Sequence, residues 1–201
     1  MVHINKGDSL ISMLLLSWLL LPLQAAGQDF DNIEIITNHV KDNIYYLEGS
    51  GGNIGVIVGN DGVLIVDNQF APLSNKIEAA ITDLSELSVT FAVNSHFHYD
   101  HTDGNENFGK AGAFIVAQEN ARRRMESTQV LATGRAQERY DEVGLPKITF
   151  TDTMRFYFND EPIDLIHTGP GHTDGDAQVY FRESNVIHTG DMFVRYVLPF
   201  I

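Results

Sequence analysis

Three histidines and an aspartate lie within one run of six residues, and this run constrains the possible fold more than any other feature. The run reads HFHYDH at residues 96–101. In an extended segment alternate side chains share a face, so His96 and His98 can reach one metal ion as a strand ends. Asp100 and His101 lie just beyond them and can turn toward a second ion. The run therefore predicts a strand whose end carries a metal site.

Two later loops repeat this design, in which an apolar strand ends in a sharp turn that carries a polar ligand. His172 follows Gly-Pro-Gly in residues 168–176, and Asp191 ends the Thr-Gly-Asp loop at residues 189–191. Ligands drawn from separate strand ends are typical of a rigid metal site. Zinc prefers imidazole and carboxylate ligands, and three protein ligands leave one position for water. The three segments together predict a zinc enzyme.

The motifs His-x-His-x-Asp-His, Gly-His-Thr and Thr-Gly-Asp, in this order and spacing, resemble those of the metallo-β-lactamase superfamily. The resemblance runs from about Ile33 to the chain end and implies an α+β fold, an αββα sandwich with two Zn²⁺ ions at one edge. By this resemblance the first zinc is held by His96, His98 and His172, the second by Asp100 and His101, and Asp191 bridges both ions. The catalytic residue that it implies is Asp100, which would orient the attacking water.

The expected reaction is zinc-dependent hydrolysis of a small ester, thioester, lactone or lactam. Zinc lowers the pKa of bound water to about 7, which provides a hydroxide nucleophile at neutral pH. One alternative is a β-lactamase proper, although zinc β-lactamases generally carry Cys or Ser where Asp191 stands. Another is a mononuclear iron oxygenase of the same fold, similar to persulfide dioxygenases, in which two histidines and a carboxylate hold Fe(II). The intact pair Asp100 and His101 argues against the oxygenase.

The region after Asp191 departs from the family pattern. Members normally continue with more helix and strand and end in a last histidine that completes the second metal site. Here the ten residues after Asp191 include no His, Asp, Glu or Cys. We therefore expect a domain at residues 28–201 that is incomplete at its C-terminus, with a second zinc site weaker than the first. The apolar end Tyr196–Ile201 favours a fragment of a longer protein.

Residues 1–27 have the pattern of a cleavable signal peptide. Lys6 precedes an apolar run at residues 10–23, and the small residues Ala25, Ala26 and Gly27 follow. The run is shorter than the roughly 20 residues that cross a membrane, so we expect no stable membrane insertion after cleavage. This pattern predicts a periplasmic or secreted protein. The chain has no cysteine, so neither disulfides nor a lipoprotein anchor is expected.

The net charge of −14 limits the possible partners. A strongly acidic surface repels phosphate backbones, so nucleic acid is excluded as an expected partner and a small-molecule substrate is favoured. The length of 201 residues fits one domain. The sequence leaves the oligomeric state open.

Short β-rich runs and turn residues predict a mixed sheet structure. Strands are expected at 33–37, 43–47, 53–58, 63–66, 89–93, 113–117, 154–158, 163–167, 178–181 and 186–188. A helical period predicts a helix at 74–87, capped by Ser74 or Asn75. Thr102 or Asp103 is expected to cap a second helix that ends at Phe108. The polar segment 118–140 is expected to form a solvated helix and loop, with a substrate-facing lid as the alternative.

The remaining acidic residues and histidines near these motifs are assigned supporting roles. His167 and His188 are expected to make hydrogen bonds around the metal site without binding the metal. Asp67 closes the strand at 63–66 and is expected to be a buried acceptor near the ligand loops. Asp174 and Asp176 are expected to form turns.

Overall fold

The computed structural model describes residues 29–194. The predicted leader at 1–27 and the apolar end Tyr196–Ile201 lie outside the described residues. Among the helices that are described, none has the length and apolar character needed to span a membrane.

A seven-stranded sheet forms the first half of the fold and has the order β1-β2-β3-β4-β5-β6-β9. The first four strands are an antiparallel meander, and the last three pair in parallel. The strands are β1 (Ile36–Lys41), β2 (Ile44–Glu48), β3 (Ile54–Gly59), β4 (Gly62–Val66), β5 (Val89–Val93), β6 (Phe114–Gln118) and β9 (Ile148–Phe150). Every residue of β4 is buried, as expected for a strand that is covered on both faces.

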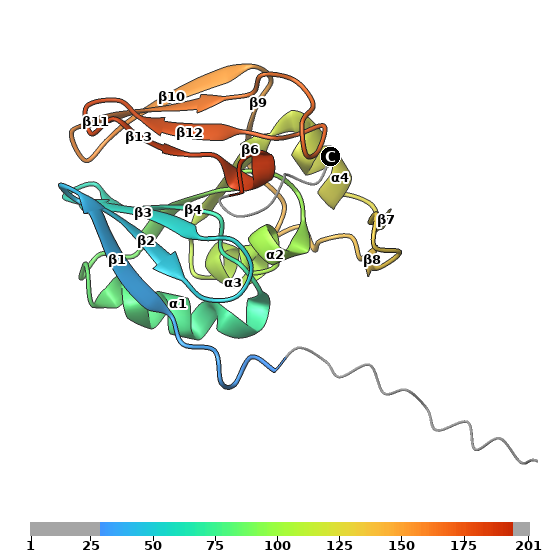
Figure 1. Ribbon diagram of the computed structural model, residues 1–201, viewed down its shortest axis with the longest axis horizontal. Helices are drawn as coiled ribbons and strands as arrows, with labels where there is room; N and C mark the ends of the chain where they lie inside the picture. Colours follow the sequence, from blue (N-terminus) through green and yellow to red (C-terminus); the bar gives the residue numbers. More distant parts are fainter. Residues whose placement is uncertain (1–28, 195–201) are drawn as a thin grey trace, which may run out of the picture.

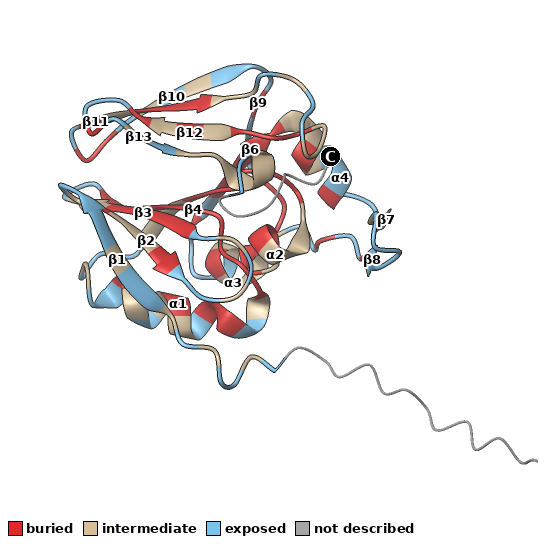
Figure 2. Cartoon of the chain, in the orientation of Figure 1, coloured by how far each residue is buried: buried red, intermediate tan, exposed pale blue. Residues whose placement is uncertain are grey.

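A four-stranded antiparallel sheet packs against the first one. It consists of β10 (Thr153–Phe158), β11 (Glu161–Ile166), β12 (Gln178–Phe181) and β13 (Val186–His188). Alternate residues such as Ile163, Leu165 and Val179 point inward and pack with Val66 and Val93 of the first sheet. Figure 2 shows these buried strand segments where the two sheets face each other. The main core therefore lies between the sheets.

The helices pack on the outer face of the seven-stranded sheet. They are α1 (Ser74–Thr82), α2 (Tyr99–Thr102), α3 (Asn105–Lys110) and α4 (Glu119–Met125), with the short 3-10 turn η1 (Ala71–Leu73). A second 3-10 turn, η2 (Gly190–Met192), instead follows β13 of the four-stranded sheet. Ile77 and Ile81 of α1 contact a second core cluster with Val56 and Ile65. Within residues 29–194 no helix covers the outer face of the four-stranded sheet (Figure 1). The described residues thus supply three layers of the expected αββα sandwich.

Several predicted boundaries were wrong at the first strand and helix. β1 begins at Ile36 rather than at residue 33, because Ile33 and Ile35 pack onto the helix-side core. The helix α1 ends at Thr82, earlier than expected, and neither Ser74 nor Asn75 caps it. The Ser74 hydroxyl is instead buried and accepts a hydrogen bond from Asn107 Nδ2 at 2.8 Å.

The region after the histidine run also differs from its prediction. Two short helices replace the single one, and α2 begins at Tyr99, inside the run. Neither Thr102 nor Asp103 is the N-cap of α3, which is Gly104; Asp103 Oδ2 instead accepts from Ala71 N at 2.8 Å, and Thr102 Oγ1 donates to His98 O. The segment 118–140 contains only the short helix α4, followed by the hairpin of β7 (Gln129–Val130) and β8 (Ala136–Gln137).

Candidate metal centre

The histidine run leaves the end of β5 and turns immediately into α2. Asn94 N donates to Val116 O at 2.8 Å, and this bond keeps the chain beside β6 after β5 has ended. His98 is the residue before α2, and its carbonyl oxygen accepts from Thr102 Oγ1 at 2.9 Å. His96 is 1% exposed, whereas His98 is partly exposed. The run therefore places one histidine inside the fold and the next at its edge.

The first group of converging side chains consists of His96, His98 and His172. One ligand atom from each lies within 4.8 Å of the others. His172 Nε2 and His98 Nδ1 are 2.9 Å apart. The loop that carries His172 is held by Asp176, whose carboxylate accepts from Thr173 N at 2.9 Å and from Thr173 Oγ1 at 2.6 Å. The structure thus brings together the three residues that the sequence assigned to the first zinc.

The second group consists of His96, His101 and Asp191, again with ligand atoms within 4.8 Å of one another. Asp191 Oδ1 is 3.2 Å from His101 Nε2, and its Oδ2 is 3.6 Å from His172 Nε2. The carboxylate therefore lies between the two groups, where a bridging ligand would stand. Asp100 is outside both groups, although its Oδ2 is 3.8 Å from His101 Nε2.

Burial and neighbouring charges set the protonation of these groups. Burial lowers the pKa of His96 well below its usual range, and the surrounding histidines lower it further. Burial and the neighbouring His172 also lower the pKa of His98. For Asp191, burial alone would raise the pKa, but the contact with His101 and the nearby histidines brings it below its usual range. Two neutral histidines and an ionised carboxylate are the forms that bind a metal.

The donor atoms of the centre fit a metal ion. Within residues 29–194, the Nε2 atoms of His96 and His101 are buried without a hydrogen bond. A buried nitrogen without a partner costs about 1–3 kcal/mol, which coordination of a metal ion would offset. The imidazole and carboxylate donors are those that zinc prefers.

Asp67 contacts the second group and holds it in place. It is 1% exposed, and its Oδ1 accepts from Ser95 N at 2.7 Å. Its Oδ2 lies 2.7 Å from Ser95 Oγ and 2.8 Å from His101 Nδ1. Burial opposes the charged form of His101, but the facing Asp67 and Asp191 carboxylates raise its pKa well above the usual range. The prediction of a buried acceptor at Asp67 is confirmed.

The two histidines with predicted supporting roles make backbone contacts near the ligand loops. His167 Nδ1 lies 2.7 Å from Asp176 O, and His188 Nε2 lies 3.0 Å from Asn53 O. Gly190 N donates to His188 Nδ1 at 3.3 Å, so His188 contacts the loop that carries Asp191. Neither histidine belongs to the two converging groups.

A glycine-rich loop at residues 49–53, between β2 and β3, lies directly on the second group, and sequence reasoning missed this role. A Cβ atom on Gly51 would come within 2.8 Å of Asp100 O, and one on Gly52 would collide with the His101 ring. Gly51 also has φ +86°, a conformation that favours glycine. These glycines therefore allow the backbone to approach the metal ligands closely.

The variant Gly52→Ala is expected to displace His101, because the added methyl group and the imidazole ring cannot share the same space. The cost in stability should be about 1–3 kcal/mol, as for other overpacked sites. Metal content and thermal unfolding of the purified variant measure the effect. Gly134→Ala is the control for metal content: its φ of +79° strains an alanine, but a Cβ there meets nothing within 4 Å and no ligand moves. Unchanged metal content in Gly52→Ala would contradict the close contact.

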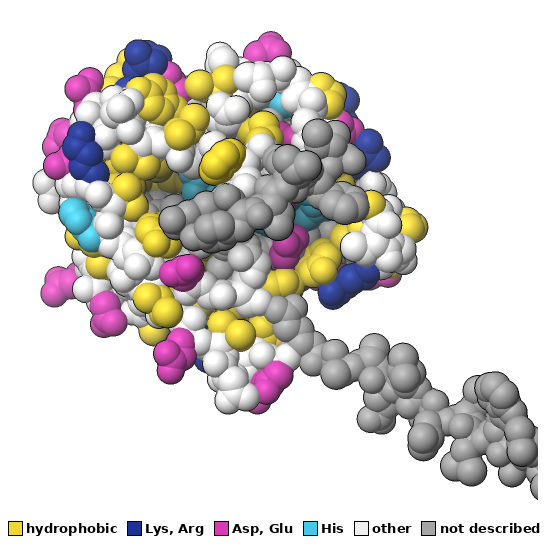
Figure 3. All heavy atoms as spheres, viewed as in Figure 1, with side chains coloured by type: hydrophobic (Ala, Val, Ile, Leu, Met, Phe, Trp, Pro, Cys, Tyr) yellow, Lys and Arg dark blue, Asp and Glu magenta, His cyan; other side chains and the backbone are white. Residues whose placement is uncertain are grey.

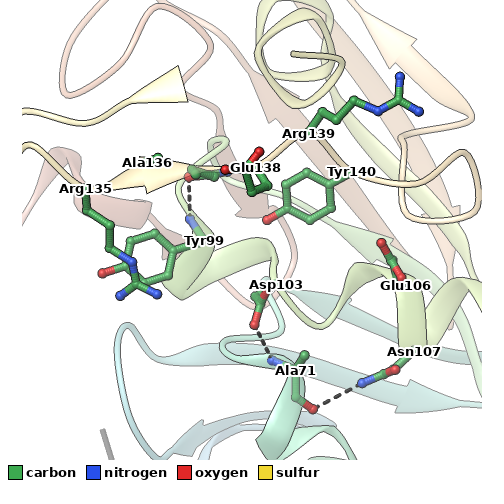
Figure 4. A pocket seen from close by; sticks show the side chains of 11 residues that line it. Ala71, Tyr99, Asp103, Glu106, Asn107, Arg135, Ala136, Glu138, Arg139 and Tyr140 are labelled. Atoms are coloured by element: carbon green, nitrogen blue, oxygen red, sulfur yellow. Dashed lines mark hydrogen bonds between the residues drawn. The ribbon is translucent and has the colours of Figure 1, made fainter. Parts of the chain in front are cut away.

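A cavity of about 390 Å³ lies beside α2 and α3, apart from the two ligand groups (Figure 4). It is lined by Tyr99, Asp103, Glu106, Arg135 and Tyr140, among others, and by no histidine. The converging histidines, and not this cavity, therefore mark the candidate site.

In Figure 3 histidine side chains are visible in the middle of the face shown, and acidic side chains are scattered around them.

Comparison with protein families agrees with this geometry. A sequence model described as "Metallo-beta-lactamase superfamily" matches residues 47–201. The chain belongs to this superfamily. The matched span includes every residue of both ligand groups.

Curated relatives in the superfamily include hydroxyacylglutathione hydrolases. The protein of this name from Brucella anthropi is 27% identical over 140 residues, which cover 69% of this chain and 46% of the relative. The one from Brucella ovis is 28% identical, with 69% and 47% covered. The chain thus spans about half the length of the curated relatives that it matches.

Solved structures of the superfamily share the fold. The class B3 di-zinc metallo-beta-lactamase from an Alaskan soil metagenome has a TM-score of 0.66 at 20% identity, covering 78% of this chain and 60% of that one. A metallo-beta-lactamase from Cronobacter sakazakii has a TM-score of 0.67 at 17% identity, covering 78% and 62%. These likenesses show the α+β architecture of the superfamily.

Proposed function

We propose that the protein is a zinc-dependent hydrolase that acts on a small ester, thioester, lactone or lactam. The observation that carries this proposal is the position of Asp191, whose two oxygens face His101 of one ligand group and His172 of the other. Such an arrangement suits two ions with a shared carboxylate. The names of the curated relatives support a thioester as the first substrate to test.

His96, His98 and His172 would hold one ion, and His101 and Asp191 would hold the other, with Asp100 beside them, its Oδ2 3.8 Å from His101 Nε2. Zinc bound there supplies an activated water nucleophile and polarises the attacked carbonyl. Asp100 is one-third exposed and its Oδ2 lies 3.8 Å from His101 Nε2, so its carboxylate is near enough to the centre to accept a proton from a water held there. Asp67 holds the His101 ring through Nδ1, which leaves Nε2 for the metal.

The proposal is tested by metal analysis and a substrate screen on the same preparation. The zinc-loaded protein is assayed with chromogenic thioester, lactone and lactam substrates, and a sample depleted of metal by chelation is the control. Hydrolysis that needs zinc supports the proposal, and the arm that reacts identifies the substrate class, β-lactams included. One bound iron with oxygen uptake and no hydrolysis would instead favour the oxygenase.

We also propose that the protein is exported and cleaved near Gln28. The support is the sequence of residues 1–27, with Lys6, the apolar run and the small residues at 25–27. Intact-mass measurement of the secreted protein should give a chain that begins at about residue 28. A secreted protein that still begins at Met1 would contradict cleavage.

A further inference from the structure

Gln137 is hydrogen-bonded to the backbone of the histidine run at residues 96–101, the ligand run. The residue is buried, and its Nε2 donates to Phe97 O at 2.7 Å. Its Oε1 accepts from Tyr99 N at 3.0 Å. Phe97 and Tyr99 are the two neighbours of His98, so one side-chain amide binds the backbone on both sides of a proposed metal ligand.

The backbone at this point has few other partners. β5 ends at Val93, and Tyr99 is the first residue of α2, so its N–H has no acceptor within the helix. His98 precedes the helix and makes no side-chain capping bond. Gln137 therefore does the work of a helix cap from a position 38 residues later in the chain. A buried backbone N–H without a partner would cost about 1–3 kcal/mol.

Two neighbouring contacts hold the same segment in place. We call residues 135–140 the brace. The guanidinium carbon of Arg135 lies 4.0 Å from the centre of the Tyr99 ring, and Tyr140 Oη lies 2.7 Å from Thr102 Oγ1. Figure 4 shows Arg135 against the Tyr99 ring and the Tyr140 hydroxyl pointing toward α2. The brace thus contacts the ligand run and α2 at three points, and Gln137 is the one that reaches the run's backbone.

We propose that Gln137 is a positioning residue for the first metal group and acts through the backbone of residues 97–99 on His98. This inference rests on the proposed function, because it requires that His98 binds a metal ion. Removing the amide leaves Tyr99 N without its acceptor and Phe97 O with only the Thr102 hydroxyl, 3.1 Å away, and so loosens the backbone that orients the His98 ring. His98 is partly exposed, whereas His96 is buried, so the position of the His98 ring depends on the backbone that carries it.

The test is zinc affinity, measured by competition with a chelator on the full chain. Gln137→Leu should raise the zinc dissociation constant of the tight site by about 10- to 100-fold, the usual effect of losing a group that orients a ligand. Gln137→Glu keeps the acceptor for Tyr99 N but loses the donor to Phe97 O, so its loss should be smaller. Circular dichroism checks that Gln137→Leu is folded. If it is not, the zinc dissociation constant of Gln137→Glu tests the inference.

Gln118→Leu is the matched control. Gln118 is also buried, and its amide also bonds at both ends, to Asn120 N and to Thr151 O at 3.1 Å, but it holds α4 and not the ligand run. This variant should lose stability and keep the parent's zinc affinity. The inference is overturned if a folded Gln137 variant binds zinc like the parent, or if Gln118→Leu weakens zinc equally. If the parent protein itself binds no zinc, the proposed function fails. If the parent binds zinc but the folded Gln137 variants bind it equally well, only the inference about Gln137 fails.

Discussion

Replacing His98 by alanine is expected to remove hydrolysis and to release the metal of the first group. Losing even a residue that orients a ligand typically costs about 10- to 100-fold in metal affinity or activity, so losing a ligand should cost at least that. The remaining His96 and His172 supply only two nitrogen donors to this group. Zinc content by mass spectrometry and the initial rate on the best substrate measure the two effects.

The control for this prediction is His39→Ala. His39 lies on the exposed strand β1, where its Nε2 is 2.9 Å from Asp42 O, far from the ligand groups in the sheet order. It should keep both zinc and activity. Full activity in His98→Ala would show that the group of three histidines is not the metal site.

Replacing Asp67 by alanine is expected to give the largest loss of stability among the residues around the centre. The change leaves His101 Nδ1 and two donors of Ser95 buried without their acceptor. Breaking a buried charged pair by removing one partner costs about 3–5 kcal/mol, a large part of the 5–15 kcal/mol that usually stabilises a domain. Urea unfolding of the metal-free protein measures it.

Asp67→Asn separates the charge of this residue from its hydrogen bonds. The amide oxygen can still accept from Ser95 N, so its loss of stability should be smaller than that of Asp67→Ala. Both variants should also bind the second metal more weakly, because His101 loses the carboxylate that fixes its ring. An Asp67→Ala protein as stable as the parent would contradict the role assigned to this buried carboxylate.

The sequence predicted the ligand segments well because their chemistry is local. Strand ends followed by His or Asp can be recognised within a few residues, and the structure brings His96, His98 and His172 together as the sequence indicated. Local patterns also located most strands, since β-branched runs and turns alternate along the chain. The parallel pairing of β4 with β5 gave no such local pattern.

The parts that were missed depend on contacts between distant segments. Gln137 meets Tyr99 across 38 residues, and a polar residue in a polar segment looks like any exposed one. The helix α1 was predicted too long because its apolar period continues to Leu84, although the chain leaves the helix after Thr82. Asp103 was expected to be a cap because Asp often is one, but its carboxylate is used by Ala71 N, 32 residues earlier. For Gln137 and Asp103 a tertiary partner outcompeted the local preference.

The ligand groups join the two halves of the sandwich. His96, His98 and His101 follow β5 of the seven-stranded sheet, whereas His172 and Asp191 come from loops of the four-stranded sheet. A metal ion held by both sets is a cross-link that the unfolded chain lacks, so free zinc at 100 times its dissociation constant would add about 2.7 kcal/mol to the stability. The concentration of zinc around the protein would then influence its lifetime as well as its activity, and chelation would leave the two sheets joined by their hydrophobic core alone.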